Sequence, residues 1–308
     1  MRFICSFVLF SLVALGPTTA VAQFSTVRLA VVPSPEETGL LRELLPAFER
    51  ESGYRVEVFP TEDPHGLARA GQADLVISHY GHMGTEAFIA QGFGLWPRAV
   101  FANQIAIFGP TSDPARIGGL QDSAEAFRRI AEKGSRSQLV SNNSGIMKYL
   151  ESILWEQAGR PAKESWYVDQ GLSEADGMTL AATLKAYYVF ALPPFLTWQQ
   201  TCSNAEASGA TARSSARPSV FPHHSAPCDM EPLVLVAMPA RIMVSMVVNP
   251  QRIAAVNVTG ATALQAYLLR PAVQARVDSF RDVRSPLQLW KSAGLHNSPA
   301  GLGLGGRP

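Results

Sequence analysis

The stretch VRLAVVPSPEETGLLRELLPAFERESGYRVEVF, residues 27–59, decides the fold class. Val27 to Val32 is a short apolar run typical of a buried strand, and residues 37–51 place leucines and a phenylalanine on one face of a helix. Gly53 is well placed to end that helix, and alternating apolar residues from Tyr54 to Val58 predict a second strand. This succession of strand, helix and strand predicts an α/β protein.

The same alternation continues through the rest of the chain. Further helices are predicted at 65–70, 123–133, 146–157, 177–185, 262–269 and 271–280. Further strands are predicted at 73–78, 99–108, 138–140, 166–168, 187–192, 232–238 and 241–248. We therefore expect an α/β fold of two lobes, each a mixed sheet flanked by helices. Two crossover strands, 99–108 and 241–248, would join the lobes around a ligand cleft.

This reading divides the chain into five parts. We expect a signal peptide at 1–22, a first lobe from 23–108 and 241–291, a second lobe at 109–240, a cysteine loop at 199–231 within it, and a flexible tail at 292–308.

Polar loops follow three predicted strands at the points where helices begin, which is where α/β sheets bind ligands. They are residues 33–39, 78–81 and 141–145. Hydroxyls, amides and glycine in these loops would let backbone N–H groups point at an anion. The alternative is that Ser34, Ser141 and Ser144 serve only as helix caps.

Several segments together resemble the tungstate-binding proteins of ABC transporters, in the superfamily of type II periplasmic solute-binding proteins. The segments are 29–41, 45–49, 71–79, 86–94, 107–110, 113–114, 144–145, 154–155, 158–159 and 247–250. The resemblance implies a type II binding-protein fold that captures a small oxyanion, tungstate or molybdate, and passes it to a membrane permease. With the polar loops, it suggests the ligand residues Ser34, Thr38, His79, Asn142, Asn143, Ser144, Gly145 and Thr179.

The ligand loops depart from the family's pattern. Consecutive threonines are replaced by Val31, Val32 and Pro33, and Glu37 and Thr38 stand where the family has Asp and Ser. The arginine that the family carries in the second-lobe loop is absent from residues 141–146, which costs a charge-assisted hydrogen bond to an anion. Arg136 and Arg241 are candidates to replace it, although neither lies in a matching motif.

Residues 1–22 have the features of a cleaved signal peptide: a basic start, an apolar core, and Ala20-Val21-Ala22 as a cleavage site after Ala22. An uncleaved membrane anchor is the alternative. Export to the periplasm would leave Cys202 and Cys228 as the cysteines of the mature chain, and we expect a disulfide between them rather than two buried thiols.

Composition and motifs narrow the function classes. The formal net charge of +1 gives no broad electrostatic footprint for nucleic acid, and the mature sequence has no transmembrane segment. No motif for a hydrolase elbow, a zinc protease helix or a Walker loop occurs, so we expect no enzyme, no cofactor and no metal. We expect a monomer whose partners are a small oxyanion and an ABC transporter permease.

Three other functions stay open. One is a divalent metal site formed by His79 and His82 with Glu37, or by His223-His224. Another is a periplasmic hydrolase, which would need a nucleophile beside a base. The last is an exported binding fold used for signalling or protein interaction, with a different ligand or none.

Overall fold

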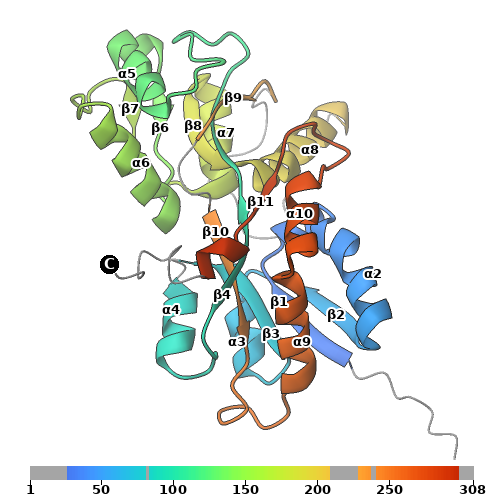
Figure 1. Ribbon diagram of the computed structural model, residues 1–308. Helices are drawn as coiled ribbons and strands as arrows, with labels where there is room; N and C mark the ends of the chain where they lie inside the picture. Colours follow the sequence, from blue (N-terminus) through green and yellow to red (C-terminus); the bar gives the residue numbers. More distant parts are fainter. Residues whose placement is uncertain (1–25, 81–82, 209–227, 237–240, 298–308) are drawn as a thin grey trace, which may run out of the picture.

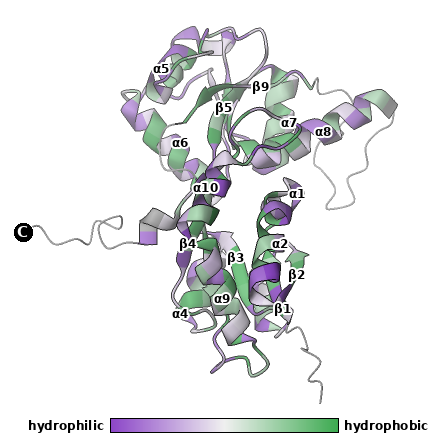
Figure 2. Ribbon diagram, turned by 45° about the vertical axis from the view of Figure 1, so that its right-hand side comes forward, coloured by the Kyte–Doolittle hydropathy of each residue, from purple (hydrophilic) through white to green (hydrophobic). Residues whose placement is uncertain are grey.

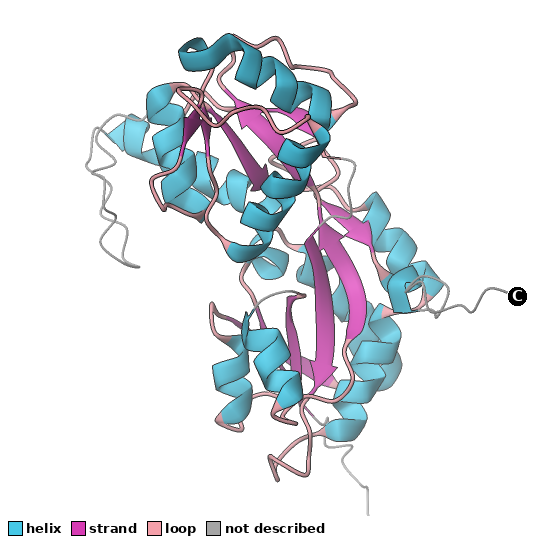
Figure 3. Cartoon of the chain, turned by 90° about the vertical axis from the view of Figure 1, so that its left-hand side faces the viewer, coloured by secondary structure: helices cyan, strands magenta, loops and turns pink. Residues whose placement is uncertain are grey.

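The computed structural model describes residues 26–80, 83–208, 228–236 and 241–297. It consists of two lobes, each built around one β-sheet with helices on its faces (Figures 1 and 3). The predicted two-lobed α/β class is therefore confirmed. The predicted signal peptide, His82, His223-His224 and the chain beyond Asn297 lie outside the described residues.

The first lobe contains a six-stranded sheet in the order β11-β4-β10-β3-β1-β2. Its strands are β1 (Thr26–Val31), β2 (Arg55–Pro60), β3 (Leu75–His79), β4 (Arg98–Asn103), β10 (Arg241–Val247) and β11 (Trp290–Ser292). Its helices are α1 (Ser34–Glu37), α2 (Leu40–Ser52), α3 (Pro64–Arg69), α4 (Met83–Ala90), α9 (Val258–Leu268), α10 (Pro271–Ser279) and the 3-10 turn η2 (Gly294–Asn297).

The second lobe contains a five-stranded sheet in the order β7-β6-β8-β5-β9. Its strands are β5 (Ile105–Gly109), β6 (Leu139–Val140), β7 (Tyr167–Val168), β8 (Tyr187–Ala191) and β9 (Glu231–Leu235). Its helices are α5 (Ser123–Lys133), α6 (Gly145–Gln157), α7 (Glu174–Leu184), α8 (Leu192–Ser208) and the 3-10 turn η1 (Gly134–Arg136).

Apolar strands build both cores, and the hydrophobic colour of Figure 2 follows β1, β3 and β4 in one lobe and β5 and β9 in the other. The predicted amphipathic helix after β1 buries its leucine face against the first sheet, and it ends at Gly53, which adopts the left-handed conformation with φ 74°. The expected single helix over 37–51 is in fact two, because Gly39 has a φ of 80° and separates α1 from α2.

The chain crosses between the lobes at Gln104. We expected one strand over 99–108, but β4 ends at Asn103 in the first sheet and β5 begins at Ile105 in the second. The side chain of Gln104 donates to the carbonyl of Val236, 3.2 Å away on the returning segment. The second lobe therefore begins earlier than the expected boundary at 109, and Gln104 ties the two crossing segments together.

Two expected irregular segments are ordered where they are described. Residues 199–208 of the expected cysteine loop continue α8, which starts directly after β8 at Leu192. In the expected flexible tail, Ser292 ends β11 and residues 294–297 form η2, whose Asn297 exchanges hydrogen bonds with the backbone of Ala99. The first lobe thus extends at least to Asn297.

The last two helices pack against the first lobe. Tyr267 of α9 donates to the carbonyl of Leu44 in α2, and Gln274 of α10 donates to the carbonyl of Val100 in β4. Among the described helices, none has the length and apolarity needed to cross a membrane.

Candidate functional site

The strand directions bring the predicted polar loops of both lobes to the junction between the sheets. β10 is antiparallel to both β3 and β4, and β1 is parallel to β3, so the C-terminal ends of β1, β3 and β4 lie at the same end of the first sheet. The C-terminal ends of β6, β7 and β8 lie together at one end of the second sheet, where the antiparallel β5 begins. Because only Gln104 separates β4 from β5, these two ends of the sheets face each other (Figure 1).

A buried hydrogen-bond network supports the second-lobe loop after β6. The hydroxyl of Ser141 donates to Glu151 at 3.0 Å and accepts from Lys148 at 2.7 Å, while Tyr167 donates to Glu151 at 2.6 Å. Burial raises the pKa of Glu151 above its usual value, and burial together with the Glu151 carboxylate raises the pKa of Tyr167. The network fixes the loop from within the lobe.

The pair formed by Ser141 and Lys148 has the spacing of a nucleophile beside a base, but its surroundings do not suit catalysis. Ser141 is fully buried, and Lys148 is held in an ion pair with Asp169 at 2.7 Å. A hydrolase needs an accessible nucleophile.

The two asparagines of the loop use their amides internally. Asn142 donates to the carbonyl of Val189, and its oxygen accepts from the backbone N–H of Ser144 and of Glu174. Asn143 donates to Asp169 at 2.9 Å. Both side chains therefore shape the loop, and the backbone N–H groups of the two residues are bonded as well, to Glu151 and to the carbonyl of Leu172.

The serines at the lobe junction do not act as helix caps. Ser34 is the first residue of α1 and Ser144 precedes α6, yet neither side chain makes a capping hydrogen bond. The Ser144 hydroxyl is buried and has no hydrogen-bond partner among the described residues. Gly145 is exposed, and a Cβ added there would meet nothing within 4 Å. This helix start is polar, uncapped and open.

The two predicted threonine ligands are occupied elsewhere. Thr38 donates to the carbonyl of Ser34 at 2.8 Å and accepts from the indole of Trp290 at 3.1 Å. Thr179 donates to the carbonyl of Ala175 and accepts from the indole of Trp198 at 3.0 Å. Because α7 begins at Glu174 rather than at the predicted Gly177, Thr179 lies inside the helix and not at its start.

His79 ends β3 at the lobe junction, with its side chain 6% exposed. Its backbone carbonyl accepts from Thr85, whose hydroxyl also lies 3.2 Å from His65 Nε2. Glu37, the third residue of the metal hypothesis, is exposed at the end of α1 and accepts from Thr197 of α8. The Glu37 carboxylate is thus used in a contact between the lobes.

Ser78, Asn103 and Glu174 were not predicted to belong to the site, but they lie at the junction with Arg241. Buried atoms without a hydrogen-bond partner in the described chain are the Ser78 hydroxyl, both amide atoms of Asn103 and Nε of Arg241. Leaving a buried polar group unpaired costs about 1–3 kcal/mol. Arg241 pairs across the junction with Glu174 of α7 at 3.5 Å. Asn103 and Glu174 lie outside the three polar loops that the sequence analysis singled out.

The two arginines considered as replacements differ in position. Arg136 is exposed in η1, which precedes β6 and so lies at the edge of the second sheet away from the first lobe. Arg241 begins β10 at the junction, with a side chain 12% exposed.

A shallow pocket of about 260 Å³ lies elsewhere, between the start of α2 and residues 280–284. It is basic, but its charges are compensated. Arg42 pairs with Glu36, and Arg284 forms an ion pair and a short hydrogen bond with Asp282. Arg281 donates to two backbone carbonyls.

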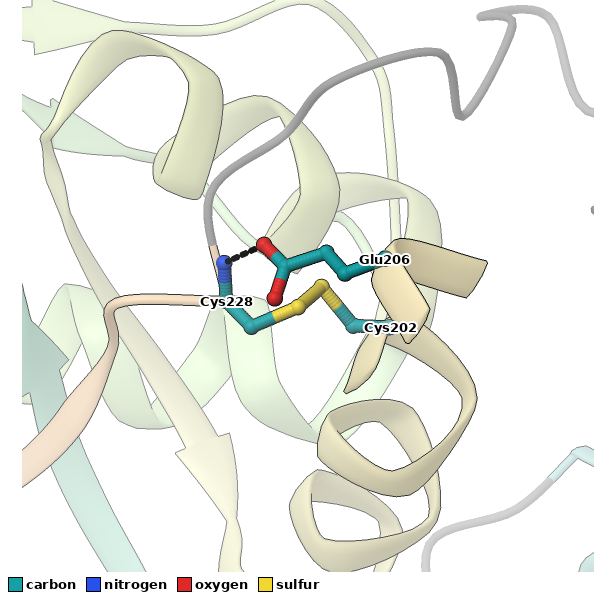
Figure 4. A group of neighbouring side chains, drawn as sticks. All are labelled: Cys202, Glu206 and Cys228. Carbon is teal, nitrogen blue, oxygen red and sulfur yellow. Dashed lines mark hydrogen bonds between the residues drawn. A yellow bond between two sulfur atoms is a disulfide. The ribbon is translucent and has the colours of Figure 1, made fainter. Parts of the chain in front are cut away.

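The structure joins Cys202 of α8 to Cys228 by the disulfide that the sequence predicts (Figure 4). Glu206 lies beside the bond and accepts from the backbone N–H of Cys228 at 3.2 Å. The three side chains are close enough to surround a metal ion, but both sulfur atoms are held in the disulfide and offer no thiolate.

Comparisons with known proteins agree with this architecture. Residues 19–219 match the model of the PBP superfamily domain. A protein of Haloferax volcanii named as an ABC transporter anion-binding protein is 32% identical over 56% of this chain and 50% of its own length. The tungstate-binding protein TupA of Peptoclostridium acidaminophilum is 28% identical over 52% of this chain and 57% of its own length. The match thus spans about half the length of each of these relatives.

Two solved structures share the fold over nearly their whole length. The tungstate ABC transporter structure from Geobacter sulfurreducens is 26% identical, with a TM-score of 0.59 over 83% of this chain and 98% of that one. The tungstate-binding protein TupA from Desulfovibrio alaskensis is 21% identical, with a TM-score of 0.63 over 88% and 99%. With both lobes accounted for and two thirds of the sequence matched, the chain belongs to the PBP superfamily.

Proposed function

We propose that this protein captures a small tetrahedral oxyanion of the tungstate and molybdate type between its two lobes. The observation that supports this most is the 26% identity to the tungstate transporter structure, which extends over both lobes and the junction between them. The anion-binding and tungstate-binding names of the two relatives agree with it.

The proposed site uses the uncapped start of α6. The first N–H groups of a helix have no partner within the helix, and its dipole favours negative charge there. Ser144 and Gly145 offer a hydroxyl and an unobstructed backbone at this point, and Ser34 offers a hydroxyl from the first lobe. His79, Asn142 and Asn143 would line the site. Thr38 and Thr179 would contribute by packing rather than by contact, because their hydroxyls are already bonded.

The place of action follows from the same proposal. The chain would be exported by a signal peptide cleaved after Ala22 and would act in the periplasm as a monomer. There it would deliver its ligand to the permease of an ABC transporter. Mass spectrometry of the protein purified from the periplasm checks the first step, because cleavage predicts a mature chain beginning at Gln23.

A thermal-shift screen tests the binding itself. A ligand that binds only the folded protein raises its melting temperature by mass action. We expect tungstate or molybdate to raise it more than sulfate or phosphate at equal concentration. Chloride at the same ionic strength is the control, and the absence of a shift with all four oxyanions would refute the proposal.

A second function, exported interaction or signalling, is favoured by one observation: the hydroxyls of Thr38 and Thr179 are used inside the protein. Deleting residues 209–227 separates the two functions. A solute receptor keeps its anion-induced thermal shift without that segment. A protein that interacts through the segment loses its partner, and it shows no anion-induced thermal shift with or without the segment.

A further inference from the structure

Arg241 and Asn103 form a buried polar pair at the junction of the lobes. They are partners in the register of β10 and β4, at the end of the first sheet that faces the second lobe. Asn103 is fully buried, and Arg241 has a buried Nε. Within the described residues, neither amide atom of Asn103 has a hydrogen-bond partner and Nε of Arg241 donates no hydrogen bond. An amide and a guanidinium with unused hydrogen-bonding capacity at one place indicate that a further group binds there.

The one ionic contact of Arg241 in the described chain is weak. Its Nη1 lies 3.5 Å from the carboxylate of Glu174, whereas charge-assisted hydrogen bonds are about 2.7–2.9 Å long. Glu174 is 39% exposed in its side chain and has a φ of 51°, a left-handed conformation that is strained for a residue with a side chain. Glu174 lies in the second lobe and contacts Arg241 of the first lobe. Because this contact is long, it uses only part of the hydrogen-bonding capacity of the guanidinium.

We propose that Arg241 and Asn103 bind the oxyanion directly, and that Glu174 occupies the place of a negative charge when the ligand is absent. This inference rests on the proposed function and names the residues that give the site its charge. The guanidinium offers two or more parallel donors to a tetrahedral anion, and the Asn103 amide adds another. The anion and Glu174 would compete for the same cation, so binding would release the Arg241 to Glu174 contact between the lobes.

Titration calorimetry with sodium tungstate, on the mature protein and its variants, tests this assignment. Arg241→Gln should weaken binding by about ten- to a hundredfold, the loss of one charge-assisted hydrogen bond. Arg241→Lys keeps the positive charge but lacks the planar guanidinium. Its tungstate affinity should lie between those of the unaltered protein and Arg241→Gln. Arg136→Gln is the matched control, because it removes an exposed arginine from the far edge of the second lobe and should leave the affinity unchanged.

Two further variants keep the test decisive if Arg241→Gln does not fold. Glu174→Gln removes the competing carboxylate and should tighten tungstate binding by about two- to fivefold, the size expected of a partly exposed ion pair. Asn103→Leu replaces a buried amide with an apolar side chain of similar size. Neither amide atom has a hydrogen-bond partner among the described residues. The substitution should leave the melting temperature of the ligand-free protein unchanged or higher while reducing the tungstate affinity at least tenfold.

The outcomes separate this inference from the proposed function. If the unaltered protein binds tungstate and Arg241→Gln binds it equally well, the assignment of Arg241 is wrong and the proposed function stands. The same holds if Glu174→Gln or Asn103→Leu leaves the affinity unchanged. If the unaltered protein binds no oxyanion, the proposed function fails and this inference fails with it.

Discussion

Gly177 and Gly145 show how two glycines near helix starts have different physical roles. A Cβ added at Gly177 would lie 2.3 Å from the hydroxyl of Tyr188, a fully buried residue whose hydroxyl donates to the carbonyl of Glu174. Gly177→Ala should therefore destabilise the protein by about 1–3 kcal/mol through overpacking. Urea unfolding measures this, and a midpoint equal to that of the unaltered protein would contradict the close packing of α7 on β8.

Gly145→Ala is the matched substitution, because nothing lies within 4 Å of the added Cβ. Alanine is favoured over glycine in a helix by up to about 1 kcal/mol, so stability should not fall. If an anion approaches the start of α6 closely, the methyl group should nevertheless weaken tungstate binding. Unchanged affinity would place the anion away from Gly145.

Within the site, the roles of single residues were the feature that the sequence predicted least well. Residue type identified Ser34 and Ser144 as polar groups at helix starts, but it could not tell a free hydroxyl from a bonded one. Thr38 and Thr179 have the right chemistry, yet each bonds an indole from a distant part of the chain, Trp290 and Trp198. Such tertiary contacts leave no local pattern in the sequence.

At the scale of elements, Asp169 links the end of β7 to the loop after β6. Hydrogen bonds from Lys148 and Asn143 lower the pKa of Asp169 from 3.8 to about 2. Because the folded-state pKa is depressed, the carboxylate stabilises the protein fully above pH 3.8, and this contribution is lost as the pH falls toward 2. The unfolding free energy of Asp169→Asn should thus lie below that of the unaltered protein at pH 5 and converge with it near pH 2. Parallel curves over this range would rule out the linkage.

The disulfide connects Cys202, in the C-terminal half of α8, to the segment before β9 across 26 positions of sequence. Replacing both cysteines with serine should lower the free energy of unfolding by about 3 kcal/mol, because the unfolded chain loses a constraint. The tungstate affinity should not change, since the disulfide holds the C-terminal half of α8 whereas the start of the helix lies at the junction. Thermal unfolding with and without reductant checks this: reductant should destabilise the unaltered protein only, and equal stability of both proteins without reductant would contradict the prediction.

Helix α8 was not predicted from local periodicity, and neither were α4 and β11. The predicted strand at 187–192 is followed by Pro193-Pro194, but prolines are tolerated in the first turn of a helix, where their missing N–H groups are not needed. The separation of α1 from α2 was also missed, because the left-handed conformation of Gly39 is not evident from the periodicity of the residues around it. By contrast, β1, β2, α5 and α6 follow strong local periodicity and were predicted to within one or two residues at each end, with β2 starting one residue later than expected.

At the scale of the whole molecule, the two-lobed organisation was predictable because each lobe repeats the alternation of strands and helices. The contacts between the lobes were not, because they join residues far apart in sequence. Thr197 of α8 donates to Glu37 of α1, Arg241 of β10 faces Glu174 of α7, and Gln104 binds the returning segment at Val236. These contacts lie between the two lobes, where we propose that the ligand binds.

Tungsten scatters X-rays anomalously, so a crystal of the mature protein grown with tungstate can reveal the position of the anion without assumptions about its ligands. We expect one strong anomalous peak between the lobes, within hydrogen-bond distance of Arg241 and near Ser144 and the start of α6. Crystals of Arg241→Gln, grown in the same way, should show a weaker peak or none. A peak in the pocket lined by Arg42, Arg281 and Arg284, or no ordered tungsten at all, would contradict the account.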